Sequence, residues 1–223
     1  DAFGDFKNMD DVIAYLSIQE DGIALEANVG FKHGHNCLAY NMIRTPKLSK
    51  EGFKAIPSEA IALLSLGLSG PESVQAQMLR QKIKDATGLE IGGDIFANVE
   101  QVTLFALPVD GASKETLPGV PPMAASLGLS LTSRDPQQTR QILTGLLTAA
   151  NLTVPQSGTE PAVADGGRYR IELVTGQSLH CYADQANRTT VLSLNPAVIN
   201  ASTSALGGKS AAEAGPLAEA VNK

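Results

Sequence analysis

The chain has no tryptophan, and aromatic residues make up only 4% of its 223 positions. Acidic residues outnumber basic ones by 23 to 17, which gives a formal net charge of −6. General binding to nucleic acid needs a basic surface and aromatic rings on which bases stack. The composition therefore argues against nucleic acid as a partner.

Long apolar runs are also missing. The longest ones, such as 61–68 and 123–131, fall well short of the ~20 residues that a membrane-spanning helix needs, so we expect no membrane span. Hydrophobic residues nevertheless make up 43% of the chain. A chain of this length and composition can bury a sizeable core, and a globular fold is expected.

Alternating apolar residues predict a β-hairpin near the start of the chain. Two β-compatible runs, 12–19 and 23–31, are joined by Glu20-Asp21-Gly22, and an Asp-Gly pair supplies the positive φ of a tight turn. A two-stranded hairpin is marginally stable alone. We therefore predict that residues 1–55 form a hairpin and a connection, and that they are the end of an upstream repeat.

A strand followed by a proline-started helix recurs along the chain, which predicts an internal repeat. Residues 65–69 and 126–130 share the sequence SLGLS, and a similar strand is expected at 191–194. An Asp-Pro pair at 135–136 and an Asn-Pro pair at 195–196 then open helices. The polar residue caps the free N–H groups of the first turn, and proline fits the first helical position.

Together these segments predict an α+β fold. Further strands are expected at 102–107 and in a ribbon at 169–182 that turns at Thr175-Gly176. For residues 56–207 we expect a mostly antiparallel sheet with helices on one face, arranged as a ferredoxin-like (split βαβ) repeat. Residues 208–223 are rich in Ala, Glu and Gly and are expected to form a flexible tail.

Several short sequence signatures together resemble those of one protein family. They are Ile56-Pro57 before a strand, Thr87-Gly88-Leu89 with Asp94-Ile95 downstream, residues 133–136 at a helix start, and Val191-Leu192-Ser193. They resemble a family of uncharacterised exported bacterial proteins that is defined by a domain of unknown function, and the resemblance covers most of residues 10–207. It implies an extracytoplasmic location (periplasmic, envelope-associated or secreted) and no known active site.

All five His and Cys residues fall in two short stretches. If the first stretch is extended, His33, His35 and Cys37 lie on one face, and His180 or Cys181 could add a fourth ligand for Zn or Cu. Adjacent strand residues point to opposite faces, so only one of His180 and Cys181 could bind the metal. The chain contains no Cys-x-x-Cys pair and no His-Glu-x-x-His sequence.

The other interpretation of these residues is structural, and we prefer it. Cys37 and Cys181 could form a disulfide, which the oxidising environment of an exported protein would allow, or could stay as small buried thiols. This interpretation implies no cofactor. The sequence also offers no set of residues that we would assign as catalytic.

The sequence therefore predicts a non-catalytic binding or structural module of a larger exported protein, with an unidentified protein or envelope component as its partner. One alternative is a metal-binding protein or metal-dependent enzyme that uses the His33/His35/Cys37 and His180/Cys181 cluster. Another alternative is a ligand carrier with an apolar pocket between helices and sheet.

Overall fold

The computed structural model describes residues 5–19, 22–35, 37, 48–68, 70, 72, 74–87, 92–108, 121–149, 167–215 and 217–218. The chain divides into two compact units, Asp1–Thr45 (unit 1) and Pro46–Lys223 (unit 2). The boundary differs from the expected one at residues 55 and 56. Phe53 and Ala55 are buried in the core of unit 2, so the segment before Ile56 belongs with the larger unit.

Unit 1 is built around one long β-hairpin, as the sequence predicts. A short 3-10 helix, η1 (Phe6–Asn8), leads into β1 (Met9–Gln19), which pairs antiparallel with β2 (Gly22–Phe31). The expected turn residues Glu20 and Asp21 lie outside the described residues.

The register of the hairpin places apolar residues of one strand opposite apolar residues of the other. Four such pairs are Val12 with Val29, Ala14 with Ala27, Leu16 with Leu25, and Ile18 with Ile23. Where the side chains are described, Val12 is 57% exposed and Val29 is 38% exposed. A two-stranded ribbon gains little stability alone, and burial of Val12 and Val29 against further structure would stabilise unit 1.

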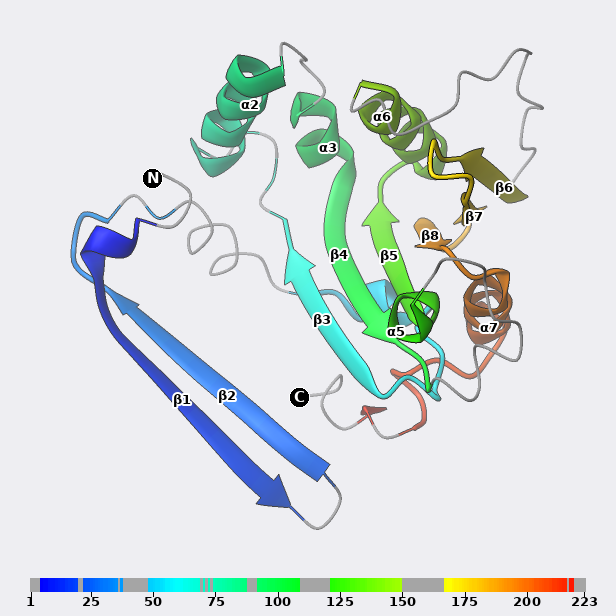
Figure 1. The fold of residues 1–223 in the computed structure, drawn as a ribbon, viewed down its shortest axis with the longest axis horizontal. Helices are drawn as coiled ribbons and strands as arrows, with labels where there is room; N and C mark the ends of the chain where they lie inside the picture. The colour runs from blue at the N-terminus through cyan, green and yellow to red at the C-terminus, as the bar shows by residue number, and fades with distance from the viewer. Residues whose placement is uncertain are drawn as a thin grey trace. The chain divides into compact units, whose positions relative to one another are not determined.

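Unit 2 contains a six-stranded sheet (Figure 1). Its strands, in order across the sheet, are β3 (Ala62–Gly67), β4 (Val99–Ala106), β5 (Leu127–Ser133), β8 (Thr189–Ser193), β7 (Ser178–Asp184) and β6 (Gly167–Glu172). Every neighbouring pair is antiparallel, which confirms the α+β class and the mostly antiparallel sheet.

The strand order differs from the expected ferredoxin-like arrangement. A split βαβ unit places a strand between two parallel strands that one helix connects. Here β3 and β4 are direct antiparallel neighbours. The reason is that two helices, α2 (Val74–Thr87) and α3 (Gly92–Asn98), lie between these strands in the chain, so the chain reverses once more before β4 begins.

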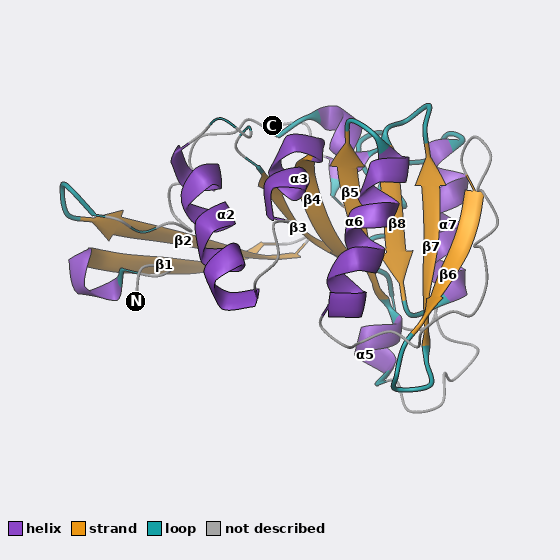
Figure 2. Ribbon diagram, turned by 90° about the horizontal axis from the view of Figure 1, so that it is seen from above, coloured by secondary structure: helices purple, strands orange, loops and turns teal. Residues whose placement is uncertain are grey.

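Helices cover both faces of the sheet, whereas the sequence predicted cover on one face. The remaining helices are α5 (Pro122–Ala125), α6 (Pro136–Ala149), α7 (Pro196–Leu206) and the 3-10 helix η2 (Lys50–Phe53). α6 places Leu143 in the apolar cluster of Leu192, while α7 places Val198 in the cluster of Val191. Val191 and Leu192 are consecutive in β8 and therefore point to opposite faces, and Figure 2 shows α6 and α7 on the two sides of β8.

The predicted helix starts of α6 and α7 are confirmed. The Asp135 carboxylate accepts a hydrogen bond from the N–H of Gln137 at 2.8 Å, and the Asn195 side-chain oxygen accepts one from the N–H of Ala197 at 2.9 Å. A proline follows each cap at the first helical position. Each start therefore satisfies a main-chain donor that the helix leaves free. No helix in the described ranges has both the length and the apolar character to cross a membrane.

The two SLGLS sequences do not occupy equivalent places. The first forms the end of β3, which stops at Gly67, while the second begins with Ser126, immediately before β5. The same five residues therefore lie at the end of one strand and at the start of the other.

The segment after residue 208 packs on unit 2, although it was expected to be a flexible tail. Ala211 is fully buried, and its N–H donates to the carbonyl oxygen of Ile56 at 2.8 Å. Ser210 and Pro57 form an isolated β-bridge beside it. Ala211 therefore packs in the core of unit 2, although the composition of residues 208–223 gave no sign of a buried residue.

Candidate docking surface

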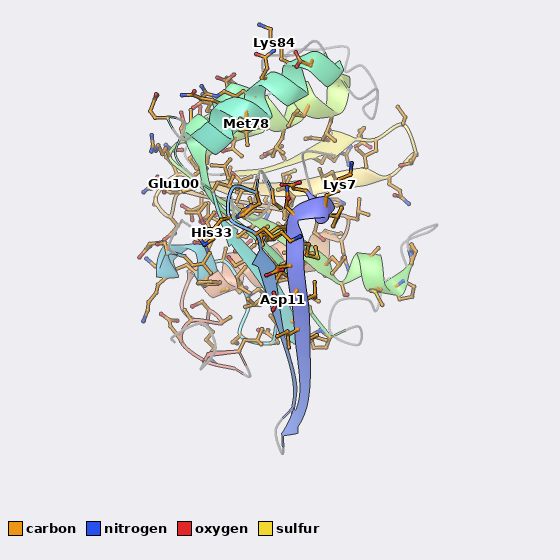
Figure 3. All side chains as sticks on the ribbon, turned by 90° about the vertical axis from the view of Figure 1, so that its left-hand side faces the viewer. Lys7, Asp11, His33, Met78, Lys84 and Glu100 are labelled. Atoms are coloured by element: carbon orange, nitrogen blue, oxygen red, sulfur yellow. The ribbon has the colours of Figure 1, made fainter. Side chains whose placement is uncertain are left out.

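The predicted metal ligands of unit 1 lie in and after a turn. Gly34 has a φ of 85°, and the N–H of His35 donates to the Lys32 carbonyl at 3.2 Å. This stretch is therefore not extended, and the alternation that would bring three ligands to one face does not hold. His33 is exposed (Figure 3), while the Nδ1 of His35 accepts a hydrogen bond from the N–H of Cys37 at 3.3 Å.

His180 and Cys181 lie on β7 and point to opposite faces of the sheet. Cys181 belongs to the cluster beneath α6, whereas Tyr182 packs against the cluster beneath α7, so His180 shares the α7 face. Burial raises the pKa of the Cys181 thiol to about 12, so the thiol stays protonated at neutral pH and is a poor nucleophile or metal ligand. Burial and the charge of Arg170 lower the pKa of His180.

The two His/Cys stretches belong to different units. In the part of the chain that the structure describes, no three His, Cys, Asp or Glu side chains gather to hold a metal ion. Both cysteines are buried, Cys37 in unit 1 and Cys181 in unit 2. The disulfide and the combined metal set therefore both stay predictions.

A groove of about 350 Å³ lies at the C-terminal end of α7. Its lining mixes polar and charged side chains, such as Ser58, Glu59 and Lys209, with alanines and glycines. It does not match the apolar pocket that a ligand carrier would need.

A row of leucines crosses the sheet and becomes steadily more exposed toward its edge. Leu192 of β8 lies opposite Leu129 of β5, which lies opposite Leu104 of β4, which lies opposite Leu64 of β3. Leu192 is 4% exposed, Leu129 is half-buried, Leu104 is 39% exposed and Leu64 is 59% exposed. Along this row, the side chains therefore become exposed between β5 and β4, although Ile95 of α3 packs in the same cluster as Val99 and Val102 of β4.

A second row beside the leucines is apolar and uncovered in the same way. Ala62 is exposed, and Ala106 and Leu127, which follow it across the sheet, are half-buried. We call Leu64, Leu104, Leu129, Ala62, Ala106 and Leu127 together the open leucine face. Figure 1 shows α2 and α3 near one end of β3 and β4, away from Ala62 and Ala106 at the other end.

β3 is also an edge strand, and some of its main-chain groups point away from the rest of the described sheet. The N–H of Leu68 donates to the carbonyl oxygen of Glu100 at 2.8 Å, just beyond the last paired residues of β3. Hydrogen-bonded pairs alternate along antiparallel strands. The main chain of even-numbered residues therefore faces β4, while that of Leu63, Ser65 and Gly67 faces away from the sheet. No described segment pairs with this side of β3.

The edge lacks the protection that soluble proteins usually give such strands. Edge strands commonly carry charged residues, proline or a bulge, which prevent pairing with other chains. Residues 60–70 contain neither a charge nor a proline, and Ile61 and Leu64 are 58% and 59% exposed. An apolar run of this kind is also typical of a fully buried strand, so the sequence gives no sign that neighbouring helices leave it uncovered.

No protein-family model matches the chain, and comparisons with curated proteins and with solved structures found no match. The resemblance to exported bacterial proteins therefore stays an expectation. The functional proposal depends on the surface geometry of the chain itself.

Proposed function

We propose that the chain is a non-catalytic binding module that acts outside the cytoplasm as part of a larger exported protein. Its partner would be a protein or another envelope component that docks on the open leucine face and the adjacent edge of β3. The single observation that supports this most is the exposure of Leu64 and Leu104, which face each other on neighbouring strands.

Exposed leucines on a sheet face are costly unless a partner covers them. Burying a leucine side chain contributes about 1.5–3 kcal/mol, and contiguous apolar patches on soluble proteins usually mark interaction sites. The strands that carry this face are nearly free of charge, since β3 and β5 contain no charged residue and β4 contains only Glu100. This composition suits a permanent or strong docking contact rather than a hydrated surface.

The hairpin of unit 1 supports the view that the chain works inside a larger assembly. Its exposed apolar pair, Val12 with Val29, has the pattern of a ribbon that is completed by further structure. We infer that the part of the protein that completes the hairpin is an adjoining repeat of the same exported protein. The expected resemblance to exported proteins agrees with a location outside the cytoplasm.

We also infer an internal repeat within unit 2. The units β5–α6 and β8–α7 each consist of a central strand, an Asx cap, a proline and a helix. The two strands are antiparallel neighbours, and their helices lie on opposite faces of the sheet. A two-fold rotation that exchanges antiparallel neighbouring strands keeps each face of the sheet, so the two units are not related by such a rotation. The inferred repeat is the shared order of strand, Asx cap, proline and helix along the chain.

Site-specific photo-crosslinking tests the proposed function. A photoreactive amino acid replaces Leu64 in the full protein, and irradiation is carried out in whole cells that produce it. We expect one predominant adduct, identified by mass spectrometry, because a docked partner lies within reach of this side chain. The adduct should disappear when Leu104→Lys is added, since a charge on the neighbouring strand opposes docking.

The matched control places the same photoreactive amino acid at Val174, which is 56% exposed in the turn between β6 and β7. No predominant adduct is expected from this position. Equal labelling from both positions, or no adduct from Leu64, would contradict the docking role of the open leucine face.

A further inference from the structure

We propose that the occupant of the β3 edge is a second copy of this chain, paired with it through the same strand. The inference rests on the proposed function, because it names the partner that docks at this surface. The two β3 strands would run antiparallel and join the two six-stranded sheets into one.

The main-chain groups that point away from the described sheet determine the register of this pairing. Leu63, Ser65 and Gly67 direct their N–H and C=O groups away from the sheet, so these residues must form the hydrogen-bonded pairs. A two-fold axis at Ser65 places Ser65 opposite its own copy. It also places Leu63 opposite Gly67 of the second copy, where the absence of a side chain leaves room for the leucine.

This register continues the leucine row across the axis. Leu64 comes to lie opposite Leu66 of the second copy. Both are even-numbered residues of β3, so both lie on the side of the sheet that carries the open leucine face. The most exposed leucine of the row would gain an apolar neighbour where the single chain leaves it 59% exposed. One contact therefore satisfies the main-chain groups and covers part of the apolar face.

The absence of charge favours a second copy. An isologous contact brings each residue close to its own counterpart, so any charged residue near the axis would repel itself. Residues 60–70 carry no charge, and the nearest acidic residues, Glu59 and Glu72, lie beyond the paired segment. A strand this short buries less area than a standard stable interface, so we expect a dissociation constant on the order of micromolar.

Sedimentation velocity of the full chain between about 1 and about 200 µM tests the proposal. The expected result is a concentration-dependent shift from the 23.3 kDa monomer to a species of twice that mass. Leu64→Lys should raise the dissociation constant at least tenfold. Val174→Lys, which adds the same charge at another exposed apolar position, should leave it unchanged.

A charge-swap experiment distinguishes two-fold pairing at β3 from other contacts. In the proposed register, residue 64 of one copy is a diagonal neighbour of residue 64 of the other copy. Leu64→Lys and Leu64→Glu should each dimerise at least tenfold more weakly than the wild type when alone. An equimolar mixture should regain the dimer, because the two opposite charges then meet across the axis.

Wild-type protein that stays monomeric at all concentrations would overturn the proposal, and so would a Val174→Lys variant that dissociates as readily as Leu64→Lys. Circular dichroism of each variant checks that it remains folded. If the chain is monomeric while the Leu64 crosslinker captures a different protein, the second copy is wrong and the docking function stands. If the chain is monomeric and no adduct forms, both proposals fail.

Discussion

Replacing Gly128 by alanine is expected to lower the free energy of unfolding of unit 2 by about 3 kcal/mol. Gly128 of β5 lies opposite Phe105 of β4, and the phenyl ring covers the glycine so closely that an added Cβ would overlap it. Phe105 is 1% exposed and belongs to the core cluster, so the ring has no space into which it can move. The substitution should destabilise the protein even though alanine is the better strand residue.

Thermal unfolding measures this effect, and we expect the melting temperature to fall by about 6–12 °C. The matched control is Gly70→Ala, because a Cβ at this exposed glycine meets open space. Its effect should stay within about 0.5 kcal/mol. Adding Phe105→Leu to Gly128→Ala should restore part of the loss, although Phe105→Leu alone destabilises. A Gly128→Ala variant as stable as the wild type would show that the ring does not cover this position.

Asn98→Ala is expected to cost about 3 kcal/mol, because one buried side chain holds three hydrogen bonds. Its Nδ2 donates to the Asp135 carbonyl oxygen and to the Thr139 hydroxyl, both at 2.8 Å, and its Oδ1 accepts from the Asp135 N–H at 2.8 Å. Asn98 is 1% exposed. Alanine would leave these partners buried and unsatisfied, and it would loosen the turn where β5 passes into α6.

Urea unfolding of Asn98→Ala provides the measurement, with Asn200→Ala as the control. Asn200 is exposed on α7, and its main-chain carbonyl accepts a hydrogen bond from the Ser204 hydroxyl at 3.0 Å, which alanine would keep. The control should therefore change stability by less than about 0.5 kcal/mol. Asn98→Asp keeps the acceptor but loses the donor, and it should lie between wild type and Asn98→Ala. A loss below about 1 kcal/mol for Asn98→Ala would contradict this account.

Local signals in the sequence were sufficient to predict several elements of the fold. The hairpin of unit 1 follows from alternation on both sides of an Asp-Gly pair, and the starts of α6 and α7 follow from Asp135 and Asn195, each followed by proline. In these cases a few neighbouring residues determine the backbone conformation. The predicted turn at Gly176 is confirmed for the same reason, since that glycine has a φ of 80°.

Features that depend on long-range packing could not be predicted in this way. Helix cover on both faces of β8 depends on where α7 packs after Asn195, and no local pattern determines that placement. The exposure of Leu64 is a second example, because the leucines of β3 and β8 look alike in the sequence. The arrangement of His33 and Cys37 is a third example. The metal prediction depended on an extended stretch with alternating side chains, and the turn at Gly34 removes that alternation.

The most direct test of the central claim is the stability of the double variant Leu64→Thr/Leu104→Thr, measured by urea unfolding at low protein concentration. Threonine keeps strand propensity while removing most of the apolar surface. If this face is open to a partner, the free energy of unfolding should change by less than about 1 kcal/mol, whereas Leu192→Thr at the buried end of the same row should cost about 3 kcal/mol. A loss of about 3 kcal/mol or more in the double variant would contradict the account, because it would show that the chain itself covers these leucines.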